Sequence, residues 1–226
     1  NMIYIKKGQE PLSLTEYRQQ PYATYEGYDK KDELREALLR DQGYLCAYCM
    51  RRITNENRDA MKIEHWKPQS SMDSEKEKMD FQIMLGVCDG CRGNQDNITT
   101  CDEHRHNREL KVNPLRQDMM ETISYTRDGR IHSTDPAIDR DLNTVLNLNC
   151  AKAPSRIVTN RKNVYAVCIQ QLMRLQPQGN WKRSTLDKVL RDWTEKKNGK
   201  YIEYAGVAIY LLKKYLAKCS WKQGTV

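Results

Sequence analysis

The fold is decided by the stretch that begins Cys46-Ala-Tyr-Cys49, passes through Ile63-Glu-His-Trp66 and closes with Cys101-Asp-Glu-His-Arg-His-Asn107. Two further cysteines, Cys88 and Cys91, lie between the second and third of these segments. A Cys-x-x-Cys pair can hold one side of a tetrahedral zinc site, and a second pair of thiols completes that site. The Glu, His and Asp side chains between and after the cysteines are the groups that a metal-dependent hydrolase needs. The stretch therefore predicts a zinc staple beside a hydrolytic site.

The sequence leaves one zinc ligand open. Cys46 and Cys49 form the first predicted pair, and Cys88 belongs to the second pair under either alternative. Spacing favours Cys91 as its companion, because Cys88 and Cys91 form another Cys-x-x-Cys. Position favours Cys101, because Cys101 begins the predicted catalytic helix. One of these two cysteines is therefore expected to be a spare thiol.

The remaining cysteines are scattered in apolar surroundings, and we expect small core residues at Cys150, Cys168 and Cys219. The segment that follows Met2 lacks the apolar run of a signal peptide. No uncharged apolar stretch approaches the ~20 residues that cross a bilayer. The sequence therefore predicts a cytoplasmic protein without a membrane span, whose cysteines are ligands and core residues rather than disulfides.

The composition favours a polyanionic partner. The chain has 226 residues, with 38 Lys and Arg against 30 Asp and Glu, which gives a formal net charge of +8. A basic surplus suits nucleic acid, because each phosphate that a protein neutralises releases counterions. A soluble protein can have the same surplus without binding nucleic acid, so charge alone supports this class only modestly.

Hydrophobic periodicity and turn residues predict the elements around this stretch. Residues 1–28 are expected to be irregular, and Gly43 ends the first helix. Pro68 prevents regular continuation of the first strand. The predicted order is a helix over 30–41, a strand over 60–66, a charged loop over 70–78, a strand over 81–87, a loop over 88–100, a helix over 101–110, a hairpin around 126–130, and three helices that begin near Pro154, Ser184 and Val207.

Glu64 and His65 are the predicted start of the hydrolytic site. A lone histidine on a strand is usually a core residue, but this one follows a carboxylate and lies between zinc ligands. Neighbours on a regular strand face opposite ways, so both reach one site only where the strand ends or twists, as Pro68 allows. Asp102 and His106 are four residues apart and are expected to share a helical face. Glu64 with Asp102 or His106 could hold a divalent metal, leaving His65 free to deprotonate water.

These residues resemble the HNH endonucleases, whose ββα-metal core is held by a Cys-x-x-Cys zinc staple. More specifically, the chain is similar to the HNH nuclease subunits of Septu anti-phage systems (PtuB), including members encoded with retrons. The resemblance implies an α+β fold in which a zinc-stapled ββα-metal core is embedded in a mainly helical chain. The similarity rests on Cys46-Ala-Tyr-Cys49, Ile63-Glu-His-Trp-Lys-Pro-Gln-Ser70, Met84-Leu-Gly-Val-Cys-Asp-Gly90, Cys101-Asp102, Val112-Asn-Pro-Leu115, Asp128-Gly-Arg-Ile131, Leu146-Asn-Leu-Asn149 and Asn198-Gly-Lys-Tyr201.

The resemblance implies a role for each matched residue. His65 matches the general base, and Glu64 matches the first ligand of a catalytic Mg²⁺ or Mn²⁺. Asp102 takes the helix ligand position of that metal, which is often Asn or His. Arg105 matches a basic helix residue suited to binding phosphate. The family pattern also makes Cys101, rather than Cys91, the fourth ligand of the structural Zn²⁺.

Two positions depart from the family pattern. The middle Asn of the HNH motif appears here as Ile83. That residue usually orients the loop at the general base, so catalytic efficiency depends on whether Asp80 or Gln82 substitutes for it. His106 falls where a small residue is more usual, so its metal role is not inherited from the family.

We divide the chain into an N-terminal segment and helix over 1–43, a nuclease core over 44–115, and a hairpin with a helical region over 116–226. The resemblance implies an ATPase partner of the Septu type (PtuA), and in retron settings a reverse transcriptase with its RNA-linked DNA. The first and last parts are candidate docking surfaces for such a partner.

Two rival functions use the same scaffold. One is a catalytically weak, zinc-stapled nucleic-acid-binding or scaffold subunit, which Ile83 favours, and the other is a ribonuclease, including one directed at tRNA.

Overall fold

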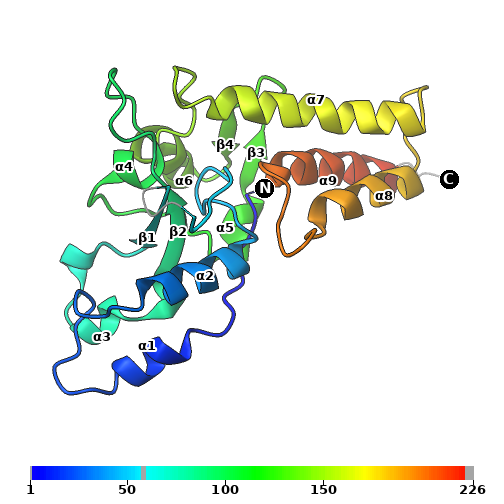
Figure 1. Ribbon diagram of the computed structural model, residues 1–226. Coiled ribbons are helices and arrows are strands. Elements are labelled where there is room, and N and C mark those ends of the chain that lie inside the picture. Colours follow the sequence, from blue (N-terminus) through cyan, green and yellow to red (C-terminus); the bar gives the residue numbers. More distant parts are fainter. Residues whose placement is uncertain (1, 57–59, 222–226) are drawn as a thin grey trace.

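The structure is a computed structural model that describes residues 2–56 and 60–221 (Figure 1). Its centre is an antiparallel pair of strands, β1 (Met61–His65) and β2 (Met84–Cys88). The register pairs Met61 with Cys88 and His65 with Met84. Helix α4 (Cys101–Arg105) contacts β2, so the predicted order of strand, strand and helix is present in mixed α and β structure.

Helix α2 (Lys31–Gln42) also contacts β2, which is buried along its whole length. The buried Gln42 amide ties the two together, because it donates to the Gly86 carbonyl (2.7 Å) and accepts from the Gly86 amide (2.6 Å). The helix ends as predicted at Gly43, which adopts φ +59°. A Cβ at this position would lie 2.3 Å from the Tyr201 ring, so both the backbone and the space require glycine.

The segments before and between the strands are more ordered than predicted. Residues 1–28 contain α1 (Leu12–Tyr17), and the predicted charged loop contains η1 (Gln69–Ser71) and α3 (Glu75–Lys78). The Ser74 hydroxyl caps α3 by accepting from the Glu77 amide. The second strand begins at Met84 rather than at residue 81, because the turn η2 (Phe81–Ile83) precedes it.

The C-terminal half consists of a hairpin and helices, as predicted. β3 (Ile123–Tyr125) and β4 (Ile131–Ser133) form the hairpin, and three long helices follow it. Figure 1 shows these helices side by side, extending away from the β1–β2 pair. None of the described helices is both long and apolar enough to cross a bilayer. The remaining elements are α5 (Gln117–Glu121), α6 (Pro136–Arg140), the π-helical turn η3 (Asp141–Val145), α7 (Ile157–Leu175), α8 (Arg183–Thr194) and α9 (Ala205–Trp221).

Buried apolar side chains form two clusters. One joins the N-terminal segment, the region of the β1–β2 pair and the hairpin, whereas the other lies between α7, α8 and α9. Leu175, the last residue of α7, is 49% exposed. Cys168 is buried as predicted, whereas Cys150 and Cys219 are only partly buried.

Candidate functional site

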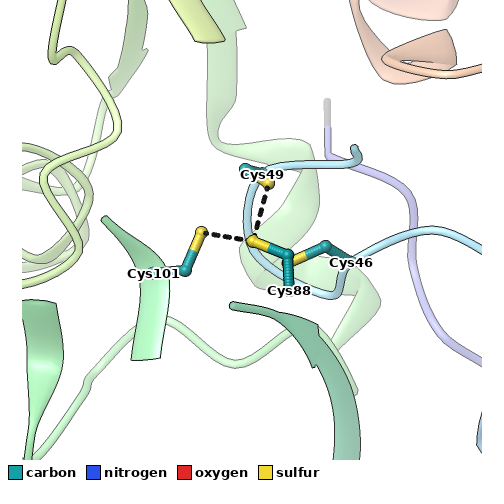
Figure 2. A group of neighbouring side chains, drawn as sticks. All are labelled: Cys46, Cys49, Cys88 and Cys101. Carbon is teal, nitrogen blue, oxygen red and sulfur yellow. Dashed lines mark hydrogen bonds between the residues drawn. The ribbon is translucent and has the colours of Figure 1, made fainter. Parts of the chain in front are cut away.

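Four buried cysteines converge where the turn after α2, the end of β2 and the start of α4 meet (Figure 2). Cys46 and Cys49 come from the turn after α2, Cys88 ends β2, and Cys101 begins α4. Their sulfur atoms all lie within 4.8 Å of one another. The Cys46 amide donates to the Arg51 carbonyl (2.8 Å), which closes the turn that carries the first pair. Three segments distant in sequence therefore meet at one group of thiols.

The sulfur separations suit zinc. The sulfur of Cys88 lies 3.8 Å from that of Cys49 and 3.7 Å from that of Cys101. A tetrahedron with Zn–S bonds of ~2.3 Å has edges of ~3.8 Å. The neighbouring thiols, Cys46 first, together with burial hold the pKa of Cys101 well above its usual range. If all four thiols ionise at this spacing, a cation must offset their charge, and this donor set fits zinc.

Cys91 lies outside this cluster. Its sulfur is 3.8 Å from both terminal nitrogens of Arg51. The amide of Thr100 donates to the Gly90 carbonyl (2.9 Å), which closes the intervening loop and returns the chain to Cys88. Of the two alternatives that spacing left open, the structure brings Cys101 and not Cys91 to the other three cysteines.

Glu64, His65 and Asp102 line one cavity of about 440 Å³ beside this cluster. The first strand ends at His65, and Pro68 precedes the turn η1. The adjacent side chains of Glu64 and His65 therefore both reach the cavity, as the position of Pro68 suggested. Asp102 is the residue after Cys101, so the cysteine cluster and the cavity share helix α4.

Two carboxyl groups face each other in this cavity. Burial, followed by the charge of Asp102, raises the pKa of Glu64 to about 8 and outweighs the opposing effect of Arg105. The Tyr48 hydroxyl also donates to Glu64 (3.2 Å). Carboxylate oxygens are the donors that Mg²⁺ and Mn²⁺ prefer, and a divalent cation would offset the repulsion between them. Glu64 and Asp102 could therefore supply two ligands of a divalent metal.

The imidazole of His65 has a defined orientation. Its Nε2 lies 2.7 Å from the carbonyl oxygen of Lys78, which can only accept a hydrogen bond. Nε2 therefore carries the proton, and Nδ1 has the free electron pair. The side-chain amide of Gln69 lies 3.1 Å from Nδ1. Burial lowers the pKa of His65, which favours the neutral form that a general base requires.

Arg105 is enclosed rather than presented at the surface, with 1% of its side chain exposed. Its guanidinium forms an ion pair with Glu64 and donates to the carbonyls of His65 (3.1 Å) and Trp66 (2.6 Å). These bonds tie the end of β1 to α4. The binding of phosphate by Arg105 stays a prediction.

His106 does not share a helical face with Asp102, so that expectation is wrong. The predicted helix over 101–110 ends at Arg105, because His106 adopts φ +52° and ψ −131°. Its side chain is exposed and still lines the same cavity. A metal role for His106 also stays a prediction.

Sequence reasoning missed the contacts of Gln69, Tyr48 and the Lys78 carbonyl. Gln69 lies within the Pro68–Ser70 segment that carried the resemblance, and Tyr48 lies inside the first Cys-x-x-Cys, so these two had a local signal. A backbone carbonyl has none, since every residue type supplies one.

Comparison with known proteins supports a nuclease, although no family model matches the chain. The chain is 27% identical over 124 residues to an Escherichia coli protein named "Retron Ec83 putative HNH endonuclease". It is similar to an HNH endonuclease. The match covers 49% of this chain and 48% of that relative, so the chain spans about half the length of the curated relative.

Proposed function

We propose that the chain is a metal-dependent HNH endonuclease that hydrolyses phosphodiester bonds of nucleic acid, with residues 44–115 as its nuclease core. One observation carries the proposal: Glu64, His65 and Asp102, from a strand end and a helix start, line one cavity beside four clustered cysteines. The basic surplus of +8 and the similarity to a retron-encoded protein support the same function.

The four cysteines would hold a structural Zn²⁺. Such a staple joins the turn after α2, the end of β2 and the start of α4. Because Asp102 follows Cys101 directly, zinc at the cluster would fix the position of Asp102 relative to Glu64 on β1.

His65 is the proposed general base. Nδ1 would accept a proton from a water molecule that attacks the phosphorus in line with the departing 3′ oxygen, after water has replaced the Gln69 amide at this nitrogen. Glu64 and Asp102 would hold Mg²⁺ or Mn²⁺, whose charge stabilises the negative charge that develops on the phosphate and the leaving oxygen. Arg105 would bind the phosphate from the same cavity. The products would carry 5′-phosphate and 3′-hydroxyl ends.

A defence role and partners form the finer part of the proposal. An ATPase subunit of the Septu type (PtuA) would control the nuclease, and in retron settings a reverse transcriptase with its RNA-linked DNA would join them. The name of the relative supports the retron setting. Residues 1–43 and 116–226 remain the proposed docking parts. In the first of these, Tyr22 (98% exposed) and Leu12 (69%) are available to a partner, whereas Tyr25 and Tyr28 are buried in the core.

The test is cleavage. The chain, with and without the ATPase encoded beside it, is incubated with DNA and with total RNA in Mg²⁺ or Mn²⁺, and His65→Ala is run alongside. Cleavage that the substitution reduces by ~10²–10⁴-fold supports the proposal and identifies the substrate class. If His65→Ala cleaves as well as the unsubstituted chain, His65 is not the general base. Cleavage of RNA alone would favour the ribonuclease.

A nucleic-acid-binding or scaffold subunit with weak catalysis is the second candidate. Ile83 at the middle motif position and the ion pair that Arg105 makes with Glu64 favour it. A titration with Mg²⁺ or Mn²⁺ separates the two functions. A nuclease binds a divalent ion in addition to zinc, and Asp102→Asn weakens that binding, whereas a pure binder shows neither effect.

A further inference from the structure

The imidazole of His65 is held by groups that lie outside its own strand. Its Nε2 contacts the Lys78 carbonyl (2.7 Å), and the edge of its ring meets the Tyr25 ring, with centroids 4.7 Å apart and an interplanar angle of 83°. Lys78 is the last residue of α3. The orientation of His65 therefore depends on the position of this short helix.

Helix α3 cannot hold its own position. It has four residues and none of them is buried, and an isolated helix of that length is unstable in water. Its contacts with the N-terminal segment supply the support. The carboxylate of Glu75 accepts from the Tyr25 amide (2.9 Å) and pairs with Lys78 (2.7 Å). Arg18 donates to the carbonyl of Met79 (2.9 Å), the residue that follows α3.

Tyr25 contacts both α3 and the ring of His65. Its amide binds Glu75 on α3, while its ring packs against His65. Tyr25 is 7% exposed, and the Lys31 ammonium lies 3.5 Å above its ring and donates to its carbonyl. One residue of the N-terminal segment thus contacts both the imidazole and the helix that orients it.

The residues around the middle motif position make other contacts. The side chain of Asp80 accepts from the Gln82 amide (2.9 Å), and the Ile83 carbonyl accepts from the Trp66 amide (2.9 Å). The described contacts of the His65 ring come instead from Tyr25, Lys78 and Gln69.

We propose that residues 10–31 are a positioning element for His65, in which Tyr25 and the Tyr25–Glu75 hydrogen bond hold α3 so that the Lys78 carbonyl fixes the tautomer of the imidazole. The catalytic consequence rests on the proposed nuclease function, but the tautomer does not. Tyr25 and Glu75 are positioning residues, since neither lines the cavity at Glu64 and Asp102.

The experiment measures the tautomer and the kinetics of the same zinc-loaded, full-length variants. Long-range ¹H–¹⁵N spectra resolve the imidazoles, because the chain has 4 histidines, and His65→Ala identifies the signals of His65. The variants are Tyr25→Leu and Glu75→Ala, with Tyr25→Phe as the conservative change. Tyr22→Ala is the matched control, because it removes a 98% exposed ring from the same segment.

The unsubstituted chain, Tyr25→Phe and Tyr22→Ala should show the single Nε2–H tautomer and equal kcat. Tyr25→Leu and Glu75→Ala should show both tautomers, and kcat should fall about tenfold with KM within about twofold, a smaller loss than removal of the base. Thermal unfolding identifies loss of fold. If Tyr25→Leu fails to fold, Glu75→Ala decides, since the Glu75 side chain is 37% exposed and its loss breaks the hydrogen bond from the Tyr25 amide.

A single tautomer in both variants overturns the proposal, as does unchanged kcat in a variant whose tautomers are mixed. If the unsubstituted chain cleaves no substrate, the nuclease proposal fails. In that case the spectra alone decide whether residues 10–31 hold the imidazole.

Discussion

The four-cysteine cluster and the cavity at Glu64 and Asp102 adjoin each other in sequence but differ in their burial and in the groups that they offer to a metal. The cluster is buried, and all four donors come from the chain. The cavity offers two facing carboxyl groups, an imidazole whose pKa is lowered by burial, and about 440 Å³ of space. Closed sites with four protein donors are structural, whereas sites that keep open positions are catalytic. The comparison teaches that, under the proposed function, one short helix would contribute to both kinds of site, with Cys101 in the first and Asp102 in the second.

Removal of a cluster ligand should have the largest effect. We expect Cys101→Ser to lose zinc and unfold the core. The binding of structural zinc contributes about 10–16 kcal/mol in small domains, which matches the free energy of unfolding of a typical domain, about 5–15 kcal/mol. Zinc content and thermal unfolding measure this. Cys91→Ser is the matched control and should keep one zinc per chain. Loss of zinc in Cys91→Ser alone would reverse the assignment.

A change at the neighbouring residue should affect only the cavity. Asp102→Asn is expected to reduce cleavage by about 10²-fold or more and to weaken Mg²⁺ binding, while zinc content and Tm stay unchanged, because one of two facing carboxylates is lost. Asp118→Asn, which alters a 63% exposed carboxylate on α5, should change neither quantity. Unfolding of Asp102→Asn would show that the two sites are not separable.

The cavity should also make stability depend on pH. Burial, followed by the charge of Asp102, raises the pKa of Glu64 to about 8. A carboxyl whose pKa is higher when folded binds more protons in the folded chain, so this contribution is present at acidic pH and is lost as the pH rises toward about 8. Zinc-loaded protein without Mg²⁺ should therefore show a lower Tm at about pH 9 than at about pH 6, and Mg²⁺ should restore it.

Glu64→Gln should remove this pH dependence. Glu103→Gln should preserve it, because Glu103 lines the same cavity but the hydrogen bond from Lys62 lowers its pKa. A Tm that is flat between these two pH values in the unsubstituted protein would contradict the raised pKa of Glu64.

The smallest expected effect lies at Gly43, between α2 and the first cysteine of the cluster. Gly43→Ala should lower the free energy of unfolding by about 1–2 kcal/mol, because alanine disfavours φ +59° and its Cβ would meet the Tyr201 ring. Zinc content should stay at one per chain. Denaturant unfolding measures the change, and an unaltered midpoint would show that the turn relaxes at no cost.

The sequence predicted those features that local patterns encode. Helix α2 and its end at Gly43 follow from an apolar stripe and a glycine, and Cys46, Cys49 and Cys88 follow from spacing. The choice of Cys101 over Cys91 depends on the closure of a loop by the Thr100–Gly90 hydrogen bond, which spacing does not encode.

Other features depend on contacts between distant residues. The short helices α1 and α3 have no apolar stripe, and partners about 50 to 60 residues away hold α3 in place. The helix after Cys101 is shorter than predicted because His106 adopts a positive φ, a conformation that is uncommon for residues other than glycine. The convergence of Glu64, His65 and Asp102 was predictable, whereas the groups that orient the imidazole were not.

The adjacency of Cys101 and Asp102 has a consequence during synthesis of the chain. Ribosomes make the N-terminal segment and both strands first, and neither the fourth thiol nor the second carboxylate exists until translation reaches α4. A nascent chain that stops before residue 101 therefore lacks the fourth cysteine of the cluster and the second carboxylate of the cavity at once. If the chain is the nuclease proposed above, the producing cell would meet an active core only after α4 has emerged, because two consecutive codons complete both groups.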